Sequence, residues 1–168
     1  MSDNAPRHQR HKSPRPLATP RELIVACAGL KSGVNLSRIV RAAACSGVLR
    51  IIYCGTGKVD AEIARDGAQT VTVQRHRSLE HCLNKLKDDG YALVGLEQTD
   101  ASCDLTSFQF PRRCVLVVGH ERRGIDDAIL QMLDGAVEIP VYGLPYSHNV
   151  ATATAIALYE YCRQYPEG

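Results

Sequence analysis

Apolar runs alternate with amphipathic segments along most of this chain. The continuous apolar runs at residues 23–27, 91–96 and 114–118 are typical of strands that are buried on both faces, and residues 49–53, 70–73 and 137–139 predict three more strands. Apolar residues at helical spacing predict helices at residues 35–46, 78–89 and 125–133 and from about 149 to 163. Strands that alternate with helices predict an α/β domain with a mainly parallel sheet flanked by helices.

Three loops stand out in this pattern because each follows a predicted strand. They are residues 29–35, 119–124 and 140–149. Ligands of parallel sheets bind beyond the carboxyl ends of the strands, so we expect these loops to form the functional site. At the first loop, Asn35 is predicted to cap the following helix and Gly47 to end it.

Composition changes this picture mainly at the amino terminus. The chain has 168 residues, which suits one domain, and its net charge of +2 neither requires nor excludes a nucleic-acid partner. Residues 1–20 hold four prolines, four Lys or Arg residues and one acidic residue. They predict a flexible basic Pro-rich arm at 1–20, followed by a single domain at 21–168. The arm is either an inert tail or a loose clamp on phosphates.

Several classes of protein are excluded by what the sequence lacks. The seven cysteines show no C-x-x-C spacing and there is no H-E-x-x-H motif or Cys/His cluster, so we expect free thiols and no metal. No apolar run is long enough to span a membrane or to form a signal peptide, which predicts a cytoplasmic protein with no membrane partner. Residues 55–58 lack the full pattern of a phosphate-binding loop, which argues against a Rossmann or P-loop protein. Ser147 stands beside His148 but not within a G-x-S-x-G motif, which argues against a hydrolase.

Candidate chemistry lies on the first predicted helix and in the second and third loops. Arg41 has apolar neighbours in the sequence, and two interpretations are open: it binds an anion, or it is an ordinary surface arginine. Glu121 lies between Gly119 and Gly124 directly after a buried strand, where backbone amides are free to meet a ligand, although an ordinary turn has the same pattern. Residues 140–149 lead into a helix whose first amides are free donors; core packing is the alternative.

Taken in order, these segments resemble the three motifs of the SpoU–TrmH family of RNA ribose 2′-O-methyltransferases, in the SPOUT superfamily. The first is the N-x5-R-x5-G pattern of residues 35–47, and the second is residues 116–125. The third comprises residues 137–140, 143, 147–150 and 159–164. The resemblance covers roughly residues 21–164. Residues 95–99 and 108–111 are similar to the branch that methylates a guanosine ribose in tRNA.

This resemblance implies a fold, a cofactor and partners. The expected fold is a SPOUT-type domain with a C-terminal trefoil knot, and the expected cofactor is S-adenosyl-L-methionine. The expected partners are RNA, with tRNA preferred, and a second copy of the chain in a homodimer whose Arg41 faces the cofactor of the other subunit. The residues that the resemblance places at the cofactor are Glu97, Gly119, Ile139, Leu144 and His148.

The resemblance also implies catalytic residues, namely Arg41, Asn35, Glu121, Ser147 and Asn149. Because arginine is a poor base, we interpret Arg41 as an electrostatic clamp on the developing ribose oxyanion and an adjacent phosphate. Asn35 would orient Arg41, and Glu121 would either hold the loop of the second motif or pair with an arginine. Ser147 and Asn149 would position the ribose and the cofactor.

Two positions depart from the family pattern. His148 stands where the family usually has Leu, and Ala151 stands where it usually has Ser. These departures make a non-catalytic RNA-binding role an alternative. The same activity on ribosomal RNA is a second alternative. A flavodoxin-like protein that binds a phosphate ligand is a further hypothesis, which rests on the α/β alternation alone.

Overall fold

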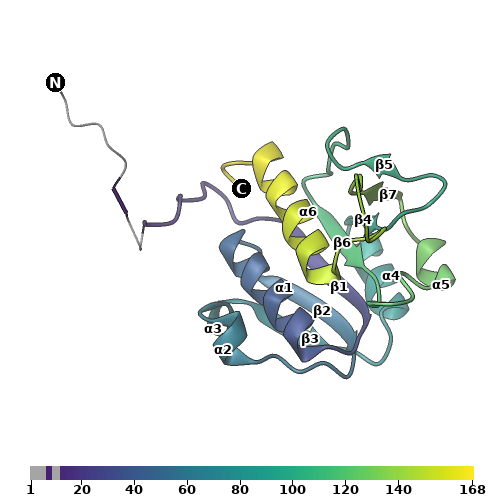
Figure 1. Cartoon of the computed structure of the whole chain (residues 1–168), viewed down its shortest axis with the longest axis horizontal. Coiled ribbons are helices and arrows are strands. Elements are labelled where there is room, and N and C mark those ends of the chain that lie inside the picture. Colours follow the sequence, from purple (N-terminus) through teal and green to yellow (C-terminus); the bar gives the residue numbers. More distant parts are fainter. Residues whose placement is uncertain (1–6, 9–11) are drawn as a thin grey trace.

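A seven-stranded parallel sheet forms the centre of the structure (Figure 1). The computed structural model describes residues 7, 8 and 12–168, and within them the strand order is β3-β2-β1-β6-β4-β7-β5. The strands are β1 (Leu23–Leu30), β2 (Arg50–Gly55), β3 (Thr72–Arg75), β4 (Ala92–Leu96), β5 (Cys103–Asp104), β6 (Cys114–Val118) and β7 (Gly135–Glu138). Neighbouring strands pair in parallel throughout, which confirms the predicted α/β class. Residues 1–6 and 9–11 of the predicted arm lie outside the described residues.

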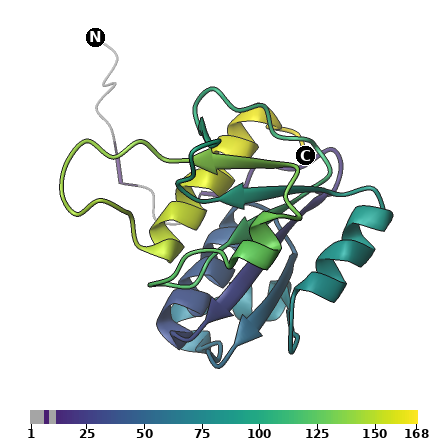
Figure 2. The same ribbon diagram turned by 90° about the vertical axis from the view of Figure 1, so that its right-hand side faces the viewer.

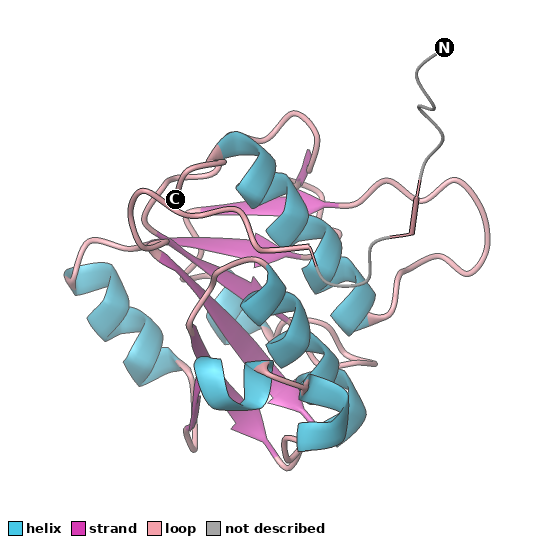
Figure 3. Ribbon diagram, turned by 90° about the vertical axis from the view of Figure 1, so that its left-hand side faces the viewer, coloured by secondary structure: helices cyan, strands magenta, loops and turns pink. Residues whose placement is uncertain are grey.

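Helices cover both faces of this sheet (Figure 3). They are α1 (Gly33–Cys45), α2 (Ala61–Ala64), α3 (Gly67–Thr70), α4 (Glu80–Asp88), α5 (Asp127–Leu130) and α6 (Val150–Gln164). Along β1, Val25 and Cys27 pack with residues of α1 and α6, whereas Ala26 and Ala28 pack with residues of α4 and α5. Successive side chains of a strand point to opposite faces, so a continuous apolar run supplies both cores.

Helix α1 begins earlier than the sequence analysis predicts. Its N-cap is Ser32, whose Oγ accepts a hydrogen bond from the backbone N–H of Asn35 (N···O 3.2 Å). The prediction that Asn35 caps this helix is therefore wrong, because the serine three residues earlier already satisfies the first turn. As a consequence, the Asn35 side chain is free to make contacts outside the helix.

The other end of α1 is as predicted. Gly47 has φ of +68°, and its backbone N–H donates to the Ala44 carbonyl (3.1 Å) while that of Val48 donates to the Ala43 carbonyl (2.9 Å). This pair of bonds is a Schellman motif, in which the left-handed residue is most often glycine.

The remaining differences concern short elements and boundaries. Strand β1 continues to Leu30, beyond the predicted residues 23–27, and β3 begins at Thr72 rather than at residue 70. Helices α2 and α3 and strand β5 are absent from the sequence-based prediction. Each has only two to four residues, which is too short to show a hydrophobic period.

The sheet order reverses between β1 and β6. Strands β2 and β3 extend the sheet on one side of β1, while β6 and the other late strands fill the opposite side. The carboxyl ends of β1 and β6 are thus neighbours at the point where ligands of such sheets bind. Beyond β7, the loop at residues 139–149 stands out from the body of the molecule (Figure 2). The C-terminal trefoil knot stays a prediction from the resemblance.

Candidate active site

A chain of hydrogen bonds joins three segments at the carboxyl ends of β1 and β6. Glu121, in the loop after β6, accepts from the backbone N–H groups of Ser32 (2.9 Å) and Lys31 (3.4 Å). It also accepts from Nδ2 of Asn35 (3.4 Å), and Oδ1 of Asn35 accepts from Nδ2 of Asn149 (3.2 Å). The structure therefore brings together one residue from each of the three predicted motifs.

The carboxylate of Glu121 is held in its ionised form. Burial acts to raise its pKa, but the backbone N–H groups of Ser32, Glu121 and Lys31 and the amide of Asn35 together lower the pKa below its ordinary value. Asn35 is only 8% exposed, so its amide depends on these partners as well. The arrangement is suited to holding loops in place and leaves Glu121 without a proton to donate at neutral pH.

Asn149 connects this network to α6. It is the N-cap of that helix, and its Oδ1 accepts from the backbone N–H groups of Ala151 (3.0 Å) and Thr152 (3.4 Å). With the oxygen directed at the helix, the Nδ2 group is left to donate to Asn35. The orientation of both amide side chains is thereby determined by the start of the helix.

The loop after β6 folds back on itself and needs glycine at both ends. The backbones of His120 and Gly124 exchange two hydrogen bonds of 2.9 and 3.0 Å. A Cβ atom on Gly119 would lie 2.3 Å from the backbone of Gly124, and one on Gly124, where φ is +70°, would lie 2.4 Å from Oε2 of Glu97. That same Glu97 oxygen accepts from the Ile125 N–H (3.0 Å), so Glu97 ties this loop to the end of β4.

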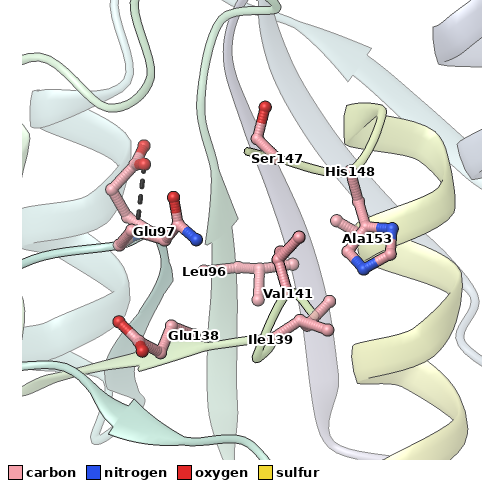
Figure 4. A pocket seen from close by; sticks show the side chains of 9 residues that line it. Leu96, Glu97, Glu138, Ile139, Val141, Ser147, His148 and Ala153 are labelled. Carbon is pink, nitrogen blue, oxygen red and sulfur yellow. Dashed lines mark hydrogen bonds between the residues drawn. The ribbon is translucent and has the colours of Figure 1, made fainter. Parts of the chain in front are cut away.

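A cavity of about 90 Å³ lies beyond the carboxyl ends of β4 and β7 (Figure 4). Its lining residues are Leu96, Glu97, Gln98, Glu138, Ile139, Val141, Ser147, His148 and Ala153. Figure 4 shows the carboxylates of Glu97 and Glu138 on one side and His148 with Ala153 on the other, with apolar side chains between them. None of the lining residues is Lys or Arg, so the cavity suits a ligand with an apolar part and no net negative charge.

The predicted cofactor residues are only partly gathered at this cavity. Glu97, Ile139 and His148 line it, together with Ser147 from the predicted catalytic set. Gly119 is buried in the loop after β6, and Leu144 is 78% exposed in the loop that follows β7. Contact of these two residues with a cofactor stays a prediction.

Arg41 lies apart from the hydrogen-bonded network. It is exposed on α1, forms no hydrogen bond or ion pair with any described residue, and does not line the cavity of its own chain. Asn35, which the sequence analysis expects to orient Arg41, directs its side chain to Glu121 and Asn149 instead. The clamp that Arg41 is predicted to form is thus not assembled within one protomer.

Sequence reasoning missed two residues that shape this region. Glu138 lines the cavity, and its Oε2 accepts a hydrogen bond from the Ser102 hydroxyl (2.5 Å). Glu138 could have been identified in the sequence as the one acidic residue within the short apolar run at 135–139. Ser32 was missed because its neighbour Asn35 is also a good capping residue.

Neither a metal cluster nor a membrane-spanning helix is present in the described part of the chain. There, no group of three or more His, Cys, Asp or Glu residues is arranged to hold a metal ion. No helix in residues 7, 8 and 12–168 is long and apolar enough to cross a lipid bilayer. All seven cysteines are free thiols.

Known proteins are similar to this chain in sequence and in fold. The family model described as "SpoU rRNA Methylase family" matches residues 22–159. An Aquifex aeolicus protein named tRNA (guanosine(18)-2'-O)-methyltransferase is 30% identical over 151 residues, which make up 88% of this chain and 72% of that protein. A Mus musculus protein named tRNA (guanosine(18)-2'-O)-methyltransferase TARBP1 is 41% identical over 90 residues, which are 54% of this chain but only 6% of the mouse protein. The solved structure of an A. aeolicus TrmH/SpoU tRNA modifying enzyme superposes with a TM-score of 0.82 at 30% identity, covering 88% of this chain and 77% of that one.

Proposed function

Because this chain belongs to the SpoU methylase family, we propose that it transfers a methyl group from S-adenosyl-L-methionine to a ribose 2′-oxygen of RNA. The proposed substrate is tRNA with a guanosine as the target, since similar proteins are named tRNA (guanosine(18)-2'-O)-methyltransferases. The observation that carries the proposal is the hydrogen-bonded chain from Glu121 through Asn35 to Asn149, which joins the three motif segments at the strand ends. A cytoplasmic location is part of the same proposal.

The residues of the cavity fit this cofactor. Leu96, Ile139 and Val141 offer apolar surface to an adenine ring, and the carboxylates of Glu97 and Glu138 favour a ligand with positive charge. When bound, S-adenosyl-L-methionine supplies an electrophilic methyl group on a positively charged sulfur. Small-molecule sites usually measure about 300–1,000 Å³, so we expect the loop at residues 140–149 to rearrange around the ligand.

Arg41 is proposed to act on the ribose oxygen. A ribose hydroxyl is a weak nucleophile at neutral pH, and a nearby cation stabilises the negative charge that develops on its oxygen during attack. Arginine stays protonated in proteins, so the hydroxyl proton passes to a phosphate oxygen or to water. The network of Asn35, Glu121 and Asn149 then serves to hold the three loops in position around the reacting groups.

A second protomer is proposed to complete the site. Arg41 is exposed on α1 and does not line the cavity of its own chain, so an arginine that meets the cofactor has to come from another copy. Apolar side chains are also exposed on α1 and α6: Val34 of α1 is 45% exposed, and Ile156 of α6 is 36% exposed. A homodimer that covers part of this surface brings Arg41 to the cavity of the partner subunit.

The replacement Arg41→Ala tests this assignment. We expect transfer of a radiolabelled methyl group to tRNA to fall by at least about 100-fold, because the variant lacks the charge that stabilises the oxyanion. Calorimetry should still show cofactor binding, since the variant leaves every residue that lines the cavity unchanged. Arg50→Ala is the matched control, because Arg50 is an exposed arginine at the start of β2, away from the network and the cavity.

Two results would contradict the proposal in different ways. Full activity of Arg41→Ala would show that the clamp role is wrong. A wild-type protein that binds RNA but gives no calorimetric signal with the cofactor would support the non-catalytic alternative instead.

A further inference from the structure

A second and larger cavity, of about 670 Å³, shares no lining residue with the cavity at β4 and β7. Its walls come from the C-terminal end of α1, from α6 and from the amino-terminal segment at residues 14–21. The lining residues are Pro14, Arg15, Leu17, Arg21, Ala44, Cys45, Ser46, Gly47, Tyr159, Cys162, Arg163 and Pro166. The volume lies within the range of ligand sites, and nothing in the proposed chemistry uses this space.

Contacts with the C-terminal end of the chain hold the amino-terminal wall in place. The backbone N–H groups of Ala18 and Thr19 lie 2.8 and 3.3 Å from the carbonyl oxygen of Glu167. Nη2 of Arg112 donates to the Thr19 hydroxyl (2.8 Å), and Nη1 of Arg21 donates to the Tyr165 carbonyl (2.6 Å). The cavity is therefore enclosed on this side by a segment with its own hydrogen bonds.

The charge of the cavity is positive. Three arginines line it and no Asp or Glu does. Arg163 is paired with Glu160 (2.8 Å), whereas Arg15 and Arg21 form no ion pair with any described residue. Arg15 is exposed and Arg21 is half-buried, and neither charge is balanced by a described carboxylate. Because unbalanced guanidinium groups bind anions through charge-assisted hydrogen bonds, these two residues favour an anionic ligand that supplies acceptors.

An aromatic ring accompanies these cations. Tyr159 lines the cavity and is 75% exposed, so its ring is free to receive a planar group. Arginines that bind phosphates, combined with an exposed aromatic ring that stacks on a base, are the typical parts of a site for unpaired nucleic acid.

The cavity also lies close to Arg41 along α1. Cys45 lines it and is four residues after Arg41, so the two are neighbours on one face of the helix. Arg38 lies three residues before Arg41 and extends this exposed face. A chain of phosphates held in the cavity therefore lies next to the arginine that is proposed to meet the target ribose.

We propose that this cavity binds an unpaired segment of the RNA substrate, with phosphate oxygens on Arg15 and Arg21 and one base stacked on Tyr159. The inference rests on the proposed function for the identity of the RNA. It adds a site outside the cofactor cavity that holds the substrate while a neighbouring ribose is methylated.

Fluorescence anisotropy of the full-length protein with a labelled tRNA transcript and with a single-stranded ribo-oligonucleotide tests this site. Arg15→Gln should weaken binding of both RNAs and reduce the slope of log affinity against log salt by about 0.7 for each single-strand phosphate that the variant no longer neutralises. Tyr159→Ala should weaken binding by about 5- to 150-fold with no change in that slope, because it removes stacking and no charge. Tyr159→Phe keeps the ring and should bind like the wild type.

Lys85→Gln is the matched control for removal of a charge, because Lys85 is exposed on α4, which packs on the opposite face of the sheet from α1 and α6. If Arg15→Gln and Tyr159→Ala bind RNA as Lys85→Gln does, the proposal is wrong. If Tyr159→Ala lowers the sedimentation coefficient instead of the RNA affinity, the cavity is a contact between protomers and the proposal is equally wrong. These measurements need no cofactor, so a failure of cofactor binding would contradict only the proposed methyl transfer.

Discussion

At the scale of single residues, Asn35 is the centre of the candidate active site. Its side chain connects Glu121 with Asn149, and only 8% of the residue is exposed. In Asn35→Ala, both neighbours are left without this partner, so we expect the free energy of unfolding to fall by about 1–3 kcal/mol in urea titrations. Asn84→Ala, on the exposed face of α4, is the control and should change it by less than about 0.5 kcal/mol. Equal stability of the two variants would show that the network contributes nothing to folding.

At the scale of elements, two glycines allow the strain at a helix end to be separated from a packing contact. Gly47 after α1 and Gly90 after α4 have φ of +68° and +85°. Alanine at either position is strained by about 1–2 kcal/mol, but a Cβ on Gly47 would also lie 2.8 Å from Cδ1 of Leu17, whereas one on Gly90 has nothing within 4 Å. Because Cδ1 is the outer end of a flexible side chain, Leu17 can rotate away at little cost, so we expect Gly47→Ala and Gly90→Ala to lower the melting temperature by similar amounts in calorimetry. A clearly larger decrease for Gly47→Ala would contradict this expectation and show that Leu17 is held rigidly against α1.

At the scale of the whole molecule, carboxylates that join separate elements predict sensitivity to acid. Burial acts to raise the pKa of both Glu121 and Asp134, but hydrogen bonds outweigh burial and lower both pKa values. The donors to Glu121 are described above. Asp134 accepts from the backbone N–H of Leu93 and from the side chain of Lys87. A lowered pKa in the folded state means that the stabilisation is complete above the unfolded pKa of about 4 and is lost as the pH falls through the folded value. The urea midpoint should therefore decrease as the pH falls below about 5, and less steeply in Glu121→Gln. A midpoint that is independent of pH in this range would contradict the expectation.

The local pattern of apolar residues was sufficient to predict most of the longer strands and helices. The continuous apolar runs predicted β1, β4 and β6 because strands buried on both faces need apolar residues at every position. The positive φ of Gly47 was predictable for a similar reason, since few other residues end a helix in that conformation. The start of α1 was not predictable from the sequence, because Ser32 and Asn35 are comparable N-cap residues. Only the three-dimensional structure provides Glu121 as a partner for the Asn35 side chain.

What the sequence determined by itself was the parallel α/β class, the family resemblance and the three segments that meet at the strand ends. These depend on residues a few positions apart, whose spacing decides periodicity and turns. Only the tertiary structure decided that Asn35 pairs with Glu121 and Asn149, which are 86 and 114 residues away in the chain, and that Arg41 faces outward. Likewise, only the fold shows that residues 14–21 form a wall of a basic cavity against α6. Such contacts follow from the order in which strands assemble, because loops adjoin in space only when their strands are neighbours in the sheet.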